Sequence, residues 1–177
     1  IDMSTFKIED HYTLLTDYEG NSLRTFYIDK KGYIWFGTID GIYIFDPTDG
    51  KLSHYKHSRT DPFSLPNNSI WEISEDRQSN VWIGTYSGTL CYVNIDENNA
   101  FKTYHPQNSG LNHTPVSAFA EDQQYLWVGT EGGGINRMNK ATGEFSYITS
   151  ANSITSNNIK SLITDAGHNL WISTFMG

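Results

Sequence analysis

The sequence predicts an all-β fold made of repeated four-stranded units, and three observations support this. The 177 residues include 25 aromatic side chains (9 Phe, 5 Trp, 11 Tyr), a composition that favours strands over helices. Four tryptophans, Trp35, Trp82, Trp127 and Trp171, recur at steps of 47, 45 and 44 residues. No segment shows apolar residues at helical spacing over the ~11 residues needed to recognise a helix. The period is that of one blade of a β-propeller.

Each unit divides into the same elements. It opens with an apolar strand that ends at an acidic residue, continues through a polar turn into the tryptophan strand and a tight glycine turn, and closes with two further strands. The first apolar positions are Leu23, Ile70, Val116 and Ile159, the second are Phe26, Ile73, Phe119 and Leu162, and the acids are Asp29, Asp76, Asp122 and Asp165. The tryptophan strands are 34–38, 81–85, 126–130 and 170–174, and the turns end in Gly41, Gly88, Gly133 and Gly177. The closing strands of the first three units are 42–46 with 51–55, 89–94 with 100–104, and 134–139 with 144–148.

Glycine and tryptophan have separate predicted roles in this pattern. The glycines inside the tryptophan strands, Gly37, Gly84 and Gly129, leave room for a neighbouring strand or aromatic ring. The turn glycines supply a positive φ, which other residues adopt at a cost. The tryptophan itself is expected to lie between blades. Ser173 replaces the strand glycine in the fourth unit, so that blade is expected to pack differently.

The last unit is truncated. We expect repeats at roughly 13–55, 56–104, 105–149 and 150–177, with residues 6–12 resembling a fourth strand ahead of the first repeat. The chain is then an arc of about three and a half blades, too few for a closed ring. Its end blades are expected to present unpaired edges, so the segment either self-associates or joins further blades of a longer chain.

Composition excludes several classes of function. The chain has 12 basic and 20 acidic residues, a net charge of -8, and no basic block, which argues against nucleic acid as a partner. No apolar run approaches the ~20 residues of a membrane span, and no leader peptide is visible. Cys91 is the single cysteine, so the chain forms no internal disulfide and no cysteine metal site.

The repeat resembles a known family. The segments SLRTFYIDKKGYIWFGTIDGIYIFD with LSHY, SIWEISEDRQSNVWIGTYSG with FKTY, and VSAFAEDQQYLWVGTEGGGINRMN with EFSY are similar to two-component regulator propeller repeats. The resemblance implies tandem propellers in the periplasmic sensor region of a membrane-anchored hybrid histidine kinase and response regulator. It further implies sensing of an oligosaccharide and control of polysaccharide utilisation.

The residues show no catalytic constellation, so we expect no enzyme activity, metal or cofactor in this segment. The six histidines form no metal-ligand motif, and the pair His54 and His57 is expected to be solvated. No nucleophile elbow or phosphate loop is present. The repeating aspartates occupy one place in every unit, which indicates hydrogen bonds to their own turns rather than paired catalytic carboxylates.

Ligand contacts are predicted where the copies differ, because such positions are free of structural demand. The variable first-strand positions are Arg24, Trp71, Ser117 and Lys160, and the variable turn positions are Asp40, Tyr86 and Glu131. Aromatic rings beside charged groups suit a sugar, although solvated loops with Trp71 as a packing residue give the same pattern. Two further readings are open, namely a protein-interaction or dimerisation scaffold and a propeller lyase.

Overall fold

The computed structural model describes residues 22–86, 89–94, 100–104, 107 and 109–176. The predicted strand at 6–12 and the turn glycines Gly88 and Gly177 lie outside these residues. In the described part every regular element is a strand. The strands are β1 (Leu23–Ile28), β2 (Ile34–Thr38), β3 (Gly41–Asp46), β4 (Lys51–Tyr55), β5 (Ile70–Glu75), β6 (Val81–Thr85), β7 (Leu90–Val93), β8 (Lys102–Tyr104), β9 (Val116–Glu121), β10 (Tyr125–Thr130), β11 (Ile135–Asn139), β12 (Phe145–Ile148), β13 (Ile159–Thr164) and β14 (Leu170–Thr174).

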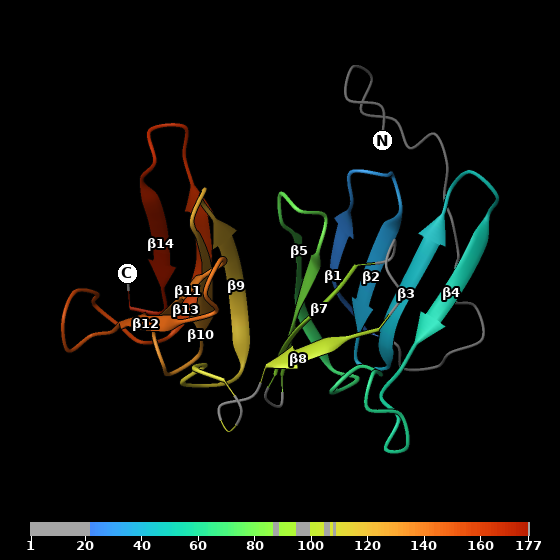
Figure 1. Ribbon diagram of the computed structural model, residues 1–177, viewed down its shortest axis with the longest axis horizontal. Helices are drawn as coiled ribbons and strands as arrows, with labels where there is room; N and C mark the ends of the chain where they lie inside the picture. The colour runs from blue at the N-terminus through green and yellow to red at the C-terminus, as the bar shows by residue number, and fades with distance from the viewer. Residues whose placement is uncertain (1–21, 87–88, 95–99, 105–106, 108, 177) are drawn as a thin grey trace.

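The strands form four antiparallel sheets, each in chain order. Blade one is β1–β4, blade two β5–β8, blade three β9–β12, and blade four has only β13 and β14. Figure 1 shows the sheets side by side, from blue and cyan at one end of the molecule to orange and red at the other. The first strands are neighbours, since β1 contacts β5, β5 contacts β9 and β9 contacts β13. The sheets do not close on themselves, which confirms the prediction of a partial propeller.

Each hydrophobic core lies between two successive blades rather than inside one. Trp35 of blade one packs with Ile70 and Ile73 of blade two in the first cluster. Trp82 packs with Val116 of blade three in the second. A small four-stranded sheet has too little apolar surface to form a core alone, so each blade depends on the next for burial. The prediction that tryptophan lies between blades is confirmed where a following blade exists.

The repeating aspartate fixes the start of the tryptophan strand in every blade. One oxygen, Oδ1, accepts backbone N–H groups of the following turn, as Asp29 does from Lys31 and Tyr33 at 3.0 Å each. The other, Oδ2, accepts the indole N–H of the repeating tryptophan. The four donor–acceptor distances are 2.9 Å for Trp35–Asp29, 2.8 Å for Trp82–Asp76, 2.9 Å for Trp127–Asp122 and 2.7 Å for Trp171–Asp165. The predicted turn bonds are therefore present, and the indole bond adds a second role that the sequence reading missed.

The strand glycines mark the closest approach between blades. An added Cβ would lie 2.7 Å from Ile70 Cγ2 at Gly37, 2.8 Å from Val116 O at Gly84 and 2.6 Å from Ile159 Cγ2 at Gly129. These neighbours are the first apolar residues of the next blade, so the predicted reason for glycine is confirmed.

The turn glycine of blade three differs from the sequence prediction. Gly41 has a φ of +104°, as expected, and an added Cβ would meet Tyr55 O. In blade three the positive φ values belong to Gly132 (+119°) and Gly134 (+73°), and not to Gly133. Gly134 is the counterpart of Gly41, because its missing Cβ faces the carbonyl of Ile148 in the fourth strand. Assigning the turn glycine to Gly133 was therefore wrong by one residue.

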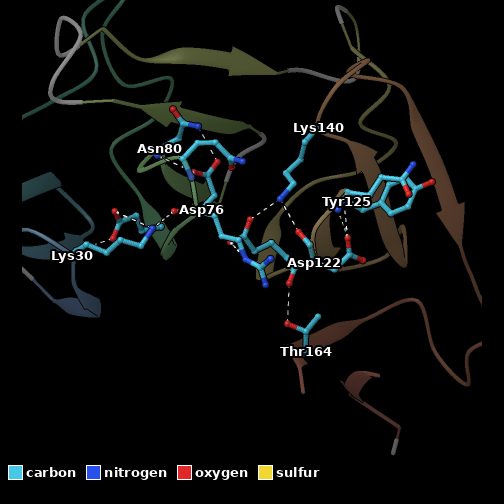
Figure 2. A network of polar contacts seen from close by, with 12 residues as sticks. Lys30, Asp76, Asn80, Asp122, Tyr125, Lys140 and Thr164 are labelled. Atoms are coloured by element: carbon cyan, nitrogen blue, oxygen red, sulfur yellow. Dashed lines mark hydrogen bonds and ion pairs between the residues drawn. The ribbon is translucent and has the colours of Figure 1, made fainter. Parts of the chain in front are cut away.

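Polar side chains connect neighbouring blades at the aspartate turns (Figure 2). Lys30 of blade one lies 3.6 Å from Glu75 of blade two, and Arg77 of blade two lies 3.6 Å from Glu121 of blade three. Each cation directly follows one repeating aspartate, and each glutamate directly precedes the next. Thr164 of blade four donates to the carbonyl of Glu121 at 2.9 Å, so it replaces the ion pair at the third junction.

Both ends of the arc expose apolar side chains. Phe26 and Ile28 on blade one are 64% and 58% exposed, and Ile163 and Trp171 on blade four are 63% and 62% exposed. Trp171 occupies the position that is buried at Trp35 and Trp82, which are 0% and 4% exposed. The described blades thus present at each end the kind of surface that is covered between them.

We predict that Asp76→Ala lowers the free energy of unfolding by about 3 kcal/mol, because it leaves the buried Trp82 indole N–H and several turn amides without an acceptor. Asp165→Ala removes the same contacts in blade four, where both partners are exposed to water, and should cost clearly less. Chemical denaturation of both variants tests this. Equal losses would show that the aspartate acts only through its own turn.

Candidate functional site

The four variable first-strand positions share one backbone feature. In each first strand one residue is left out of the pairing with the second strand: Leu23 pairs with Thr38 and Thr25 with Gly37, so Arg24 is unpaired. The same β-bulge occurs at the other variable positions, which are Trp71, Ser117 and Lys160. At a β-bulge the extra residue is unpaired, and its side chain departs from the regular alternation between the two faces of the strand. This explains why the residue type varies there while the preceding position stays apolar, as Leu23, Ile70, Val116 and Ile159.

A second set of equivalent positions follows the threonine that ends each second strand. These positions are Ile39, Tyr86, Glu131 and Phe175. In three blades the backbone N–H of this residue donates to the segment just before the first strand of its own blade. The bonds run from Tyr86 to Ser69 O (2.9 Å), from Glu131 to Pro115 O (3.0 Å) and from Phe175 to Asn158 O (3.0 Å). The turn residues therefore lie beside the start of each first strand, next to the bulges.

Three residues from these two sets form a stack. The rings of Trp71 and Tyr86 lie 5.3 Å apart at 24°. The guanidinium carbon of Arg24 lies 5.1 Å from the centroid of Trp71 and 6.0 Å from that of Tyr86. Arg24 comes from blade one and the two rings from blade two, so the stack spans a junction between blades. Cation–π attraction holds the arginine over the rings.

Tyr86 also lines an open pocket of about 380 Å³. The other lining residues are Pro115, Glu131, Asn158, Lys160 and Phe175, which come from blades three and four. Lys160 forms an ion pair with Glu131, and its ammonium lies 5.8 Å from the ring of Phe175. The pocket thus has two aromatic walls, Tyr86 and Phe175, and a charged pair between them. A sugar ring has apolar faces and a hydroxyl rim, and this arrangement suits both.

Five of the seven predicted residues meet at this stack and pocket, and two do not. Ser117 is 6% exposed, and its hydroxyl donates to the carbonyl of Ile159 at 2.7 Å, so it joins blades three and four. Asp40 pairs with Lys56 at 2.7 Å and does not line the pocket. Asp40 is one residue beyond the position equivalent to Tyr86, which in blade one is Ile39. The alignment of the turns in the sequence was off by one residue there.

The sequence reading missed Phe175, Pro115 and Asn158. Phe175 was detectable, because it follows the threonine of its strand as Tyr86 and Glu131 do. Pro115 and Asn158 belong to the connections between blades, which vary in length, and nothing in the repeat pattern singles them out. Their place beside the pocket follows only from the hydrogen bonds between turns and connections.

The histidine pair has a structural role. His54 stacks on Tyr43 with ring centroids 3.8 Å apart, and its Nε2 lies 2.7 Å from Asp40 O. It is half-buried rather than solvated, which corrects that expectation, whereas His57 is exposed. Among the described residues no group of three His, Cys, Asp or Glu side chains is placed to hold a metal. The described residues also include no helix long and apolar enough to cross a membrane.

One half-buried acid, Glu72, lies beside the site. Glu72 follows the bulge residue Trp71 and pairs with Gly84 across the sheet. Burial raises the pKa of Glu72 to about 7, and no cation in the described part of the chain forms an ion pair with it. Blades one and three have Thr25 and Ala118 at this position, which are small. The carboxylate therefore occupies a place where the repeat normally needs no charge.

Repeated four-stranded blades with a rim of bulge and turn residues define a β-propeller whose loops carry the candidate binding site. Three segments, residues 17–40, 64–87 and 110–132, match the sequence profile of the two-component regulator propeller. These three segments are therefore two-component regulator propeller repeats. No curated protein matches the chain.

Solved structures agree on the fold. The extracellular domain of a candidate hybrid two-component system from B. thetaiotaomicron superposes with a TM-score of 0.80 at 21% identity. The alignment covers 96% of this chain and 23% of that one, so this chain spans about a quarter of its length. A protein described as a candidate gluconolactonase superposes with a TM-score of 0.61 at 12% identity, covering 86% of this chain and 57% of that one. At these identities the similarity establishes the propeller fold.

We predict that Glu72→Gln stabilises the protein at pH 8 by about 2 kcal/mol and has little effect at pH 4. The pKa of Glu72 is higher in the folded than in the unfolded state, so folding disfavours the ionised form. That cost is full above the folded pKa and disappears below the unfolded pKa, where both states are protonated. Denaturation at the two pH values measures it, with Glu144→Gln at an exposed site as the matched control. A gain independent of pH would contradict the prediction.

Proposed function

We propose that this segment binds an oligosaccharide at the rim formed by the stack and the pocket, as part of the sensor region of a hybrid two-component receptor. The observation that carries the proposal is the convergence of Tyr86, Glu131, Lys160 and Phe175 on one pocket, next to Arg24 and Trp71. These residues come from four blades but from only two repeat positions, which are the positions where the copies vary. A fold whose blades stay the same while the residues of one rim vary can recognise different ligands.

The family and the fold of its neighbour support the signalling part of the proposal. The repeats are those of two-component regulators, and the neighbour with the TM-score of 0.80 is an extracellular domain of a candidate hybrid two-component system. We therefore propose an extracytoplasmic, specifically periplasmic, location for the segment. The parent chain would be membrane-anchored and would carry a histidine kinase and a response regulator that control polysaccharide utilisation.

A scaffold role is the second candidate, and the exposed ends of the arc favour it. Phe26, Ile28, Ile163 and Trp171 form surfaces of the type that pack between blades. Another copy of the segment, or further blades of the parent chain, would cover them. In a scaffold the rim would contact no small molecule, so the two candidates differ in their response to a glycan.

We predict that Trp71→Ala and Tyr86→Ala each weaken oligosaccharide binding by about tenfold, because each removes an aromatic face of the site. Calorimetric titration of the complete extracytoplasmic region with fragments of plant and host polysaccharides measures the affinity. Phe63→Ala, which removes a 62% exposed ring that lines neither the stack nor the pocket, is the control and should bind as the unmodified protein does.

Two results would contradict the proposal. If both variants kept full affinity for a glycan that the unmodified protein binds, the ligand would not contact this rim. If no glycan bound, and light scattering showed the segment to be a stable dimer, the scaffold role would replace it.

A further inference from the structure

We propose that the rim selects an acidic oligosaccharide, and that Arg24 binds its anionic group. This inference rests on the proposed function and names the class of ligand. The anionic group is a carboxylate, as in a uronic acid, or a sulfate ester, since both present oxygen atoms in a geometry that a guanidinium fork matches.

The first argument is the state of the Arg24 guanidinium. It forms no ion pair and no hydrogen bond with any described residue, and its contacts are with the faces of Trp71 and Tyr86. Stacking uses the face of the group and leaves the N–H donors on its edge available. A guanidinium held in this way is fixed in orientation but has its strongest hydrogen-bonding capacity unused. An oxyanion in the plane of the group would satisfy it bidentately.

The second argument is the contrast with the other cations of the described residues around this face. Lys160 is neutralised by Glu131, and Lys56 by Asp40. Arg24, in contrast, has no acidic partner among the described residues. In a chain with a net charge of -8, such a charge is conspicuous, because acidic side chains outnumber basic ones.

The third argument is the position of Arg24 relative to the pocket. Tyr86 belongs to both the stack and the pocket lining, so the guanidinium and the pocket are separated by a single ring. A ligand that occupies the pocket and continues across Tyr86 reaches Arg24. This assigns a direction: the acidic residue of the glycan lies over blades one and two, and a neighbouring sugar lies between Tyr86 and Phe175, where Glu131 and Lys160 face its hydroxyls.

Arg24 is also suited to specificity rather than folding. It is exposed, it occupies a bulge that pairs with no other residue, and the equivalent residue differs in every blade. Replacement of Arg24 should therefore leave the fold intact and remove the preference for an anionic group.

Matched ligands test the proposal. Oligogalacturonates are titrated beside the same oligosaccharides after carboxyl reduction, and sulfated galactan oligosaccharides beside their desulfated forms, using the complete extracytoplasmic region. We expect at least one acidic member to bind about tenfold more tightly than its neutral counterpart. Arg24→Gln should remove that difference between the acidic and the neutral member. Arg59→Gln, which removes the same charge from an exposed loop, should preserve the preference. The melting temperature of Arg24→Gln should equal that of the unmodified protein.

The outcomes separate this inference from the proposed function. If neutral oligosaccharides bind as tightly as acidic ones, or if Arg24→Gln retains the preference, the assignment of Arg24 is wrong while the glycan site stands, provided that Trp71→Ala still weakens binding. If neither member of any pair binds, both proposals fail. A preference confined to the carboxylate pair or to the sulfate pair supports the inference and identifies the anionic group.

Discussion

The hydrogen bond from the tryptophan indole to the aspartate carboxylate is the interaction on which the blades depend. It joins the end of the first strand to the middle of the second and sets the orientation of the tryptophan ring. In blade three the turn is one residue shorter, yet Trp127 reaches Asp122 at the same distance that Trp35 has from Asp29. The hydrogen bond between tryptophan and aspartate is therefore present in both blades although their turns differ in length. An ionised acceptor makes it stronger than a neutral hydrogen bond, and the bonds from Trp171 and Asn169 lower the pKa of Asp165 to about 2.

Once the tryptophan ring is oriented, two contacts determine how neighbouring blades pack. The indole of one blade lies against the apolar first strand of the next, and the strand glycine leaves space for the leading residue of that strand. Ion pairs such as Lys30–Glu75 add contacts at the turn end of the same junction. Such half-exposed ion pairs contribute little to the free energy of folding. Their main effect is therefore on how neighbouring blades are positioned relative to each other. Cores shared in this way make every blade dependent on its neighbours.

The bulge explains how a rigid repeat can carry a variable site. At the bulge the backbone of the first strand leaves the ladder for one residue, so Arg24, Trp71, Ser117 and Lys160 differ without loss of pairing. The tight turn that ends each second strand lies next to the bulge and is free to vary for the same reason. In blades one, two and four the variable residues are therefore distinct from the residues that pack the blades together. Ser117 is the exception, because its small side chain is used to join blades three and four.

The sequence by itself determined the blades, their order, the role of the strand glycines and the two variable repeat positions from which the candidate site is built. It could do so because a repeat compares four copies of one local structure, and strand pairing within a meander is local. Only the tertiary structure decided which variable residues meet. Ser117 is hydrogen-bonded to Ile159 of blade four, and Asp40 pairs with Lys56. Phe175 of blade four lines the same pocket as Tyr86 of blade two. These contacts depend on the angle between blades and on connections of unequal length, and the repeat pattern specifies neither.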